Sequence, residues 1–251
     1  PGYKDVEHDD IIVFNYPIEV KPISQKTYYI KRAVGLPGDS LEVIDKRVYR
    51  NGELEPNHEG LQMFYTVYTK GNARLSPQKV EASKAELMGL LPNSSIYVIN
   101  ATDEAIEKVR GWTEVDSVAL YSSPQEELKR GYRNPDFNFS LGFNNNDNMK
   151  KFEVPYEGLE VELTPENWHI YQDIVERYER NSVERKGDQF IINGEETKTY
   201  TIQQDYYFLM GDNRDNSEDG RSWGFVPDDH IVGKAAFVWW SYDSFPLWPR
   251  F

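Results

Sequence analysis

Short apolar runs, each followed by turn residues, recur at both ends of this 251-residue chain. The run Ile11–Phe14 ends at Asn15-Tyr16-Pro17, and two later runs lead into the pairs Asn51-Gly52 and Asn193-Gly194. A run of this length bounded by turn residues predicts a buried strand. An Asn-Gly pair accepts positive φ at both positions, as tight two-residue hairpins require. The pattern therefore favours a mostly β fold.

The clearest strand predictions lie near the two ends of the chain, and we expect them to belong to one β-domain. They cover residues 11–14, 28–33, 206–210 and 233–240. Helical signals are confined to the middle. Ser123-Pro124 combines a capping box with proline at the first helical position and predicts a short helix to Lys129. Thr164-Pro165 opens a longer one, whose apolar residues at helical spacing are Trp168, Tyr171, Ile174, Val175 and Tyr178.

This distribution of strand and helix signals predicts a discontinuous domain with an insertion. The simplest architecture is a β-core made of residues 1–52 and 185–251, with an inserted α+β subdomain over residues 53–184. A chain of 251 residues is long enough for one or two domains of ordinary size.

Composition excludes several classes of function. The net charge of −14 disfavours a nucleic-acid partner, because phosphates would be repelled. There is no cysteine, and the four histidines (His8, His58, His169 and His230) show no metal-ligand spacing, so we expect neither a metal nor a cofactor. The longest uninterrupted apolar run, Ala235–Trp240, is much shorter than the roughly 20 residues of a membrane span. We expect both ends of the sequence to be cut points in a longer protein.

Three segments carry the chemistry: Tyr29–Asp39, Met210–Pro227 and Ile231–Ala235. The first contains Lys-Arg followed by Gly-Leu-Pro-Gly-Asp, and the second begins Met-Gly-Asp-Asn-Arg-Asp-Asn-Ser. Together they resemble the conserved boxes of the type I signal peptidase (leader peptidase) family, in the family's order. The resemblance covers the two ends of the chain and leaves most of the insert unexplained.

The resemblance implies a fold, an activity and a location. The fold would be a signal-peptidase-like β-domain with an inserted subdomain. The parent enzyme would be a serine endopeptidase that uses a Ser-Lys dyad, without metal or cofactor. It would remove signal peptides from exported preproteins after small residues. It would be anchored in the bacterial cytoplasmic membrane by an N-terminal span absent from this sequence, with this domain on the extracytoplasmic side.

Lys31 is the candidate general base. It follows three large apolar or aromatic residues, so an alternating strand could direct its side chain into an apolar environment. Burial disfavours the ammonium form and can lower the pKa of a lysine by several units. A lone lysine of this kind is ordinarily a solvated residue on an edge strand. The resemblance instead implies the general-base role, with the hydroxyl of Ser217 orienting the amine.

The resemblance also implies supporting and substrate-binding residues. Asp219 and Arg221 would form an ion pair that stiffens the site, and Arg32 with Asp212 would form another. Without the family, charged residues two apart in a loop are usually a solvated pair. The strand before the lysine, with Tyr28, Tyr29 and Ile30, would pair with an extended substrate. A pocket role and a core role for Ile30 remain equally open.

The nucleophile is the departure from the family pattern. The family's serine box, Ser-x-Met with a proline downstream, should precede the Ile11 strand, and the sequence contains nothing like it. Ser24, Ser40, Ser76 and Ser117 stand in no such context. We therefore expect this chain alone to be inactive, because it cannot form an acyl-enzyme and lacks the oxyanion donors of that box. One alternative is a catalytically dead paralogue that binds extended peptides or a membrane partner. A weaker alternative is the Ser-Lys self-cleaving repressor group, which lacks the long Gly-Asp-Asn-Arg box.

Overall fold

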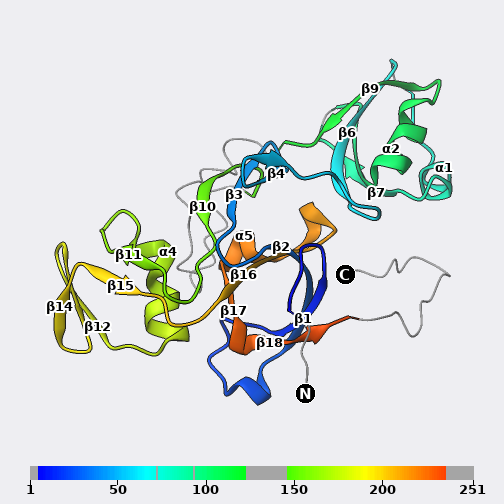
Figure 1. Ribbon diagram of the computed structural model, residues 1–251. Coiled ribbons are helices and arrows are strands. Elements are labelled where there is room, and N and C mark those ends of the chain that lie inside the picture. Colours follow the sequence, from blue (N-terminus) through cyan, green and yellow to red (C-terminus); the bar gives the residue numbers. More distant parts are fainter. Residues whose placement is uncertain (1–4, 72, 93, 123–145, 236–251) are drawn as a thin grey trace. The chain divides into compact units, whose positions relative to one another are not determined.

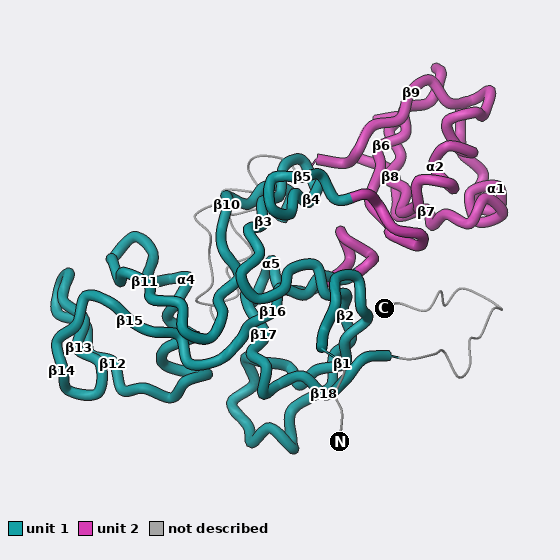
Figure 2. The backbone as a smooth tube through the Cα atoms, viewed as in Figure 1, with its two compact units in different colours: residues 1–55, 124–211, 218–249 teal, residues 56–123, 212–217, 250–251 magenta. Residues whose placement is uncertain are grey.

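A computed structural model describes residues 5–71, 73–92, 94–122 and 146–235, and these form two compact units (Figures 1 and 2). Among the described residues, unit 1 contains 5–55, 146–211 and 218–235, and unit 2 contains 56–122 and 212–217. No helix in the described part of the chain is long and apolar enough to cross a membrane.

Among the described residues, the central sheet of unit 1 has five antiparallel strands in the order β17-β16-β2-β1-β18 (Figure 1). Their bounds are β1 Ile11–Asn15, β2 Tyr28–Gly35, β16 Tyr206–Met210, β17 Val226–Pro227 and β18 Ile231–Lys234. The first three strand predictions are therefore confirmed. The fourth is only partly described, since β18 ends at Lys234 and residues 236–240 lie outside the described residues.

Strand β16 is buried on both faces of this sheet. Phe208 and Met210 join the larger hydrophobic core of unit 1, whereas Tyr207 and Leu209 join a smaller core with Ile12 and other residues. Side chains alternate across a strand, so a strand buried on both faces must be apolar throughout. This explains the unbroken apolar run of β16.

The described part of unit 1 also contains smaller antiparallel sheets, in the orders β10-β3-β4-β5, β11-β15 and β12-β13-β14. Their bounds are β3 Ser40–Ile44, β4 Arg47–Arg50, β5 Glu53–Leu54, β10 Met149–Glu153, β11 Glu160–Glu162, β12 Val183–Lys186, β13 Gln189–Ile192, β14 Glu195–Thr197 and β15 Thr199–Thr201. Both predicted hairpins are confirmed. Asn51 and Gly52 have φ of 55° and 86°, and Asn193 and Gly194 have φ of 53° and 88°.

The described residues of unit 1 include two short α-helices, α4 (Trp168–Gln172) and α5 (Gly220–Trp223). Helix α4 continues as a π-helical turn, Asp173–Tyr178. The predicted helix is therefore confirmed, although Thr164 and Asn167 first close a turn through reciprocal hydrogen bonds of 2.8 and 3.3 Å. Its apolar face is buried as expected, except that Tyr171 is only partly buried. The other predicted helix, Ser123–Lys129, lies outside the described residues.

Unit 2 is an α+β structure built on the antiparallel sheet β7-β8-β6-β9. Its elements are β6 Met63–Thr69, α1 Pro77–Ala82, β7 Glu86–Leu90, β8 Ile96–Ala101, α2 Asp103–Arg110 and β9 Val115–Leu120. Thr102 caps α2 by accepting a hydrogen bond from the amide of Ala105 at 3.3 Å. Ile106 and Val109 on one face of α2 share a core with Val67 and Ile99 of the sheet.

The division of the chain differs from the predicted one in two respects. Residues 146–184 belong to unit 1 and not to the α+β unit, because β10 pairs with β3 and Trp168 shares the larger core with Phe208. In the other direction, residues 212–217 belong to unit 2 although they lie far from it in sequence. The chain therefore crosses the unit boundary twice inside the Gly-Asp-Asn-Arg box, between Gly211 and Asp212 and between Ser217 and Glu218.

Candidate active site

Strand β2 positions Lys31 in the central sheet of unit 1. Lys31 lies opposite Ile12 of β1, and the next residue, Arg32, lies opposite Met210 at the end of β16. Alternation places Lys31 on the same face of β2 as Tyr29 and Ala33, which pack in the smaller core with Ile12. Lys31 is half-buried. The Lys31 side chain therefore lies on an apolar face of the sheet.

The register of β2 directs part of its backbone away from β1. The amide of Tyr16 donates to the carbonyl of Thr27, and the amide of Ala33 donates to that of Asp10, both at 2.8 Å. Hydrogen-bonded pairs alternate along an antiparallel ladder, so the backbone groups of Tyr28 and Ile30 face the opposite side. On that side β2 pairs with β16, and among the described residues this pairing ends where Met210 lies opposite Arg32.

The second half of the box, residues 218–224, is built around a buried ion pair. Arg221 donates from Nε to Oδ1 of Asp219 at 2.8 Å and from Nη2 to Oδ2 at 2.7 Å, and the side-chain exposures are 3% and 0%. Asp219 also accepts the amide of Gly211 at 3.0 Å. Burial opposes the ionised form, but the Arg221 guanidinium and these hydrogen bonds outweigh it and lower the pKa of Asp219. The predicted Asp219–Arg221 pair is therefore present.

Close packing fixes this half of the box against the central sheet. A Cβ atom at Gly220 would lie 2.9 Å from the carbonyl oxygen of Leu209 and 3.1 Å from Cε2 of Phe208. Trp223 is buried, and its ring is T-shaped to that of Tyr29 at 5.8 Å between centroids. Tyr29 also stacks on Tyr16 at 4.4 Å. Tyr29 is thus a packing residue of the lysine strand itself.

The first half of the box, residues 212–217, is held by the segment that leads into β6. Gln62 donates its amide to the carbonyl of Asp212 at 2.8 Å and accepts the amide of Arg214 at 2.9 Å. The Asp212 carboxylate lies 2.9 Å from Nε2 of His58, and the Asp215 carboxylate accepts the amide of Phe64 at 2.7 Å.

The structure separates the predicted site residues by unit. Lys31, Arg32, Asp219 and Arg221 lie in unit 1 with the strand Tyr28–Ile30, whereas Asp212 and Ser217 lie in unit 2. Tyr28 is 64% exposed, and Ile30 is half-buried on the same face of β2. Arg32 donates to the carbonyl of Asp9 at 2.8 Å. The Arg32–Asp212 pair and the Lys31–Ser217 contact stay predictions.

The sequence does not indicate the role of two side chains that help to hold the first half of the box, His58 and Asp215. His58 is distant from the box in sequence and shows no metal-ligand spacing, so no local pattern assigns it to Asp212. Asp215 was given no role, although it stands inside the box two residues before Ser217.

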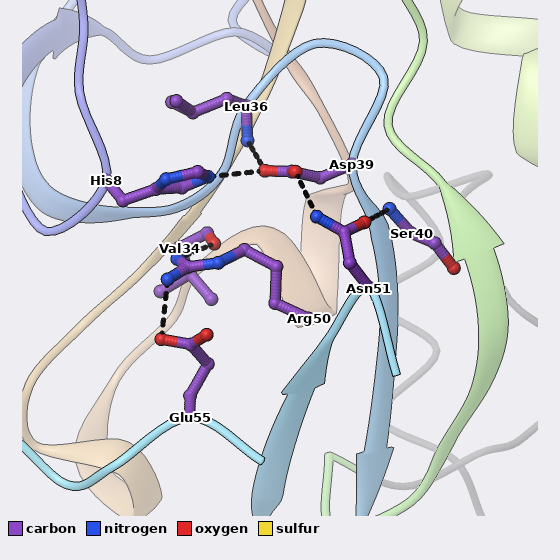
Figure 3. Close-up of polar contacts among 8 residues, drawn as sticks. All are labelled: His8, Val34, Leu36, Asp39, Ser40, Arg50, Asn51 and Glu55. Carbon is purple, nitrogen blue, oxygen red and sulfur yellow. Dashed lines mark hydrogen bonds and ion pairs between the residues drawn. The ribbon is translucent and has the colours of Figure 1, made fainter. Parts of the chain in front are cut away.

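The turn after β2 is organised by Asp39, the last residue of the first box (Figure 3). Its Oδ2 accepts the amide of Leu36 at 2.8 Å and lies 2.7 Å from Nε2 of His8. Its Oδ1 accepts from Nδ2 of Asn51 at 2.8 Å, and Asn51 in turn accepts the amide of Ser40 at 2.9 Å. Burial opposes ionisation, but these bonds lower the pKa of Asp39. Asp39, at the end of the segment Tyr29–Asp39, therefore joins the turn after β2 to the Asn51-Gly52 hairpin.

The described part of the chain contains no candidate metal site. No group of three His, Cys, Asp or Glu side chains there is arranged to hold a metal ion.

The chain belongs to the family described as "Signal peptidase, peptidase S26". Residues 1–105 and 153–240 match the sequence profile of that family. The matched ranges include the lysine strand, the Asp39 turn and the whole Gly-Asp-Asn-Arg box.

Individual relatives agree with this assignment. The chain is 34% identical over 114 residues to "Signal peptidase I" of Buchnera aphidicola subsp. Acyrthosiphon pisum (strain APS), covering 45% of this chain and 35% of that protein. It is 24% identical over 238 residues to the protein of that name from Buchnera aphidicola subsp. Schizaphis graminum (strain Sg), covering 95% and 55%. It is 26% identical over 249 residues to "Signal peptidase I" of Pseudomonas aeruginosa (strain PAO1), and the match covers 95% of this chain and 50% of that protein. The chain thus spans about half or less of these relatives.

Proposed function

We propose that this chain is the catalytic part of a membrane-bound serine endopeptidase that removes signal peptides from exported preproteins after small residues. Its partners would be signal peptides and the bacterial cytoplasmic membrane, with the domain on the extracytoplasmic side and no nucleic acid. One observation carries the proposal. The pairing of Arg32 with Met210 joins the lysine strand to the start of the Gly-Asp-Asn-Arg box within one sheet.

In this proposal Lys31 is the general base of a Ser-Lys dyad. An amine takes a proton from a serine hydroxyl only when it is neutral, and partial burial beside apolar side chains favours the neutral form. The half-buried position of Lys31, opposite the fully buried Ile12, supports this role. Ser217 would orient the amine, and the Asp219–Arg221 pair would keep the backbone around it rigid.

The substrate would bind as an additional strand beside β2. Backbone groups of Tyr28 and Ile30 face away from β1, and an extended peptide could pair with them. Strand addition would provide affinity through the backbone, and alternate side-chain pockets would provide specificity. Selection of small residues would then come from side chains on this stretch of β2, among them Ile30.

The nucleophile is not among the serines considered above, so a polypeptide of residues 1–251 should cleave a signal-peptide substrate at the uncatalysed rate. The test compares that polypeptide with the gene product carrying whatever residues precede Pro1. Cleavage by the gene product should disappear in Lys31→Ala and persist in Lys21→Ala, which removes an exposed lysine from the loop before β2. Cleavage that survives Lys31→Ala would refute the dyad.

A second candidate is a catalytically dead paralogue that binds extended peptides. The backbone of Tyr28 and Ile30 favours it equally, because strand pairing requires no catalytic lysine. The two candidates differ in the gene product. A dead paralogue would bind an extended signal peptide but cleave none, and Lys31→Ala would leave its affinity unchanged.

A further inference from the structure

An isolated parallel bridge attaches the first half of the box to the rest of unit 2. Gln62 and Asn213 form a parallel bridge, in which the amide and the carbonyl of Gln62 bond Asp212 and Arg214 respectively. Gln62 is itself fixed from β8, because Nδ2 of Asn100 donates to its side-chain oxygen at 3.1 Å. Asn100 is only 2% exposed. The attachment point is therefore part of the folded body of unit 2.

Asp215 makes the second attachment. Its carboxylate accepts the amide of Phe64, the second residue of β6, at 2.7 Å. The carbonyl of Phe64 accepts the amide of Tyr121, just after β9, at 2.8 Å. Phe64 is thus held from both sides, and a hydrogen bond from an amide to a carboxylate is stronger than a neutral one. This bond fixes the end of the segment that leads to Ser217.

The chain between Asp215 and Ser217 has little freedom. Asp215 lies within a 3₁₀ turn, Arg214–Asn216, and Ser217 follows immediately. The turn is closed by the amide of Asn216, which donates to the carbonyl of Asn213 at 3.1 Å. A displacement of Asp215 therefore moves the backbone of Ser217 with it.

We propose that Asp215 is a positioning residue for Ser217, and that unit 2 acts as the scaffold for this half of the box. This inference rests on the proposed function, in which Ser217 orients the Lys31 amine, and it gives the inserted subdomain a role in that reaction. Loss of the Asp215 carboxylate releases the turn, so Ser217 samples positions in which its hydroxyl no longer orients the amine.

A structural test uses the 251-residue chain and requires no activity. Asp215→Ala should increase the backbone mobility of Ser217, measured by ¹⁵N relaxation, while Gly211 and Arg221 stay as rigid as in wild type. Asp215→Asn should restore order, because its amide oxygen can still accept the Phe64 amide. The matched control is Asp103→Ala, which removes another carboxylate bonded to β6, through the hydroxyl of Tyr65 at 2.9 Å. Unchanged Ser217 mobility in Asp215→Ala would overturn the proposal.

A kinetic test uses the gene product and a double-mutant cycle. Asp215→Ala should lower kcat/KM about tenfold to a hundredfold, mainly through kcat, since a displacement of about 1 Å can cost this much. In a Ser217→Ala background the same substitution should have almost no further effect, because the two residues act through one hydroxyl. Asp215→Asn should retain most of the activity, and Asp103→Ala all of it.

The outcomes separate this inference from the proposed function. If Ser217→Ala and Lys31→Ala leave cleavage intact, the proposed function fails. If Lys31→Ala abolishes cleavage and Ser217→Ala lowers it to a measurable residual rate, but Asp215→Ala does not reduce it, only the positioning role fails. Equal and additive losses from Asp215→Ala with and without Ser217 would also overturn it, because they would show that Asp215 acts independently of the hydroxyl.

Discussion

The two halves of the Gly-Asp-Asn-Arg box are held in different ways. Residues 218–224 are embedded in unit 1, with a buried ion pair and a glycine in contact with β16. Residues 212–217 attach to unit 2 through two backbone bonds to Gln62 and through half-buried carboxylates. The first set of contacts resembles a protein core, and the second resembles a surface loop bonded to a strand.

This difference separates stability from positioning within one motif. Replacing a buried, paired charge leaves its partner charged and desolvated, which is costly. Replacing a half-buried hydrogen bond allows water to take its place. We therefore expect substitutions after Ser217 to reduce the stability of the fold, and substitutions before it to affect mainly the order of the loop.

The largest expected effect is that of Asp219→Asn. The variant leaves the Arg221 guanidinium buried without a counter-charge, which should cost about 3–5 kcal/mol of unfolding free energy. Urea unfolding at neutral pH measures it. Asp188→Asn, on the exposed turn between β12 and β13, is the control and should change stability by about 0.5 kcal/mol or less. A loss below about 1 kcal/mol in Asp219→Asn would show that the second half is not a stability element.

The pH dependence of the same pair follows from the lowered pKa of Asp219, whose ordinary value is 3.8. Because the folded-state pKa is the lower one, the unfolded chain takes up this proton first as pH falls. The carboxylate stabilises the fold fully above about pH 5, and this contribution disappears as pH falls through the folded-state pKa. The stability gap between wild type and Asp219→Asn should therefore narrow on acidification, and a gap that widens would contradict the assignment.

A smaller effect is expected for Gly220→Ala, which tests packing without changing charge. The added Cβ would lie 2.9 Å from a backbone oxygen that cannot move without shifting β16. Overpacking of this kind costs about 1–3 kcal/mol. Gly233→Ala is the matched control, since a Cβ at that position on β18 meets no atom of the described residues within 4 Å. Thermal unfolding of both variants should show a lower Tm for Gly220→Ala only, and equal Tm values would contradict the packing argument.

The sequence was informative where local chemistry decides the structure. Apolar runs identified β1, β2 and β16, and the Asn-Gly pairs identified two hairpins, because each signal lies within a few residues of the feature it specifies. The Asp219–Arg221 pair could also be predicted, since the family resemblance places both residues in one short loop. The fold class followed from these features.

The remainder depends on contacts between distant segments. Nothing near Asp215 indicates that its partner is the amide of Phe64, and nothing near His58 indicates Asp212, because these pairs are about 150 residues apart in the chain. The same reason explains why the unit boundary inside the box could not be foreseen. The π-helical turn after α4 was also unexpected, since helical spacing predicts the buried face but does not distinguish α from π geometry.

The smallest expected effect is that of His58→Ala in the first half of the box. The His58 and Asp212 side chains are 20% and 17% exposed, so water can replace the lost contact, and the unfolding free energy should fall by only about 0–1 kcal/mol. The two backbone hydrogen bonds of Gln62 remain, but residues 212–217 lose the contact between Asp212 and His58. Hydrogen exchange should therefore become faster at the amides of Gln62 and Arg214, and remain unchanged at Gly211 and Arg221.

His8→Ala provides a comparison, because it removes a similar contact, to Asp39, in the turn after β2. If His58→Ala instead accelerates exchange at Gly211 and Arg221, the two halves of the box behave as one cooperative element, and the contrast between them is wrong.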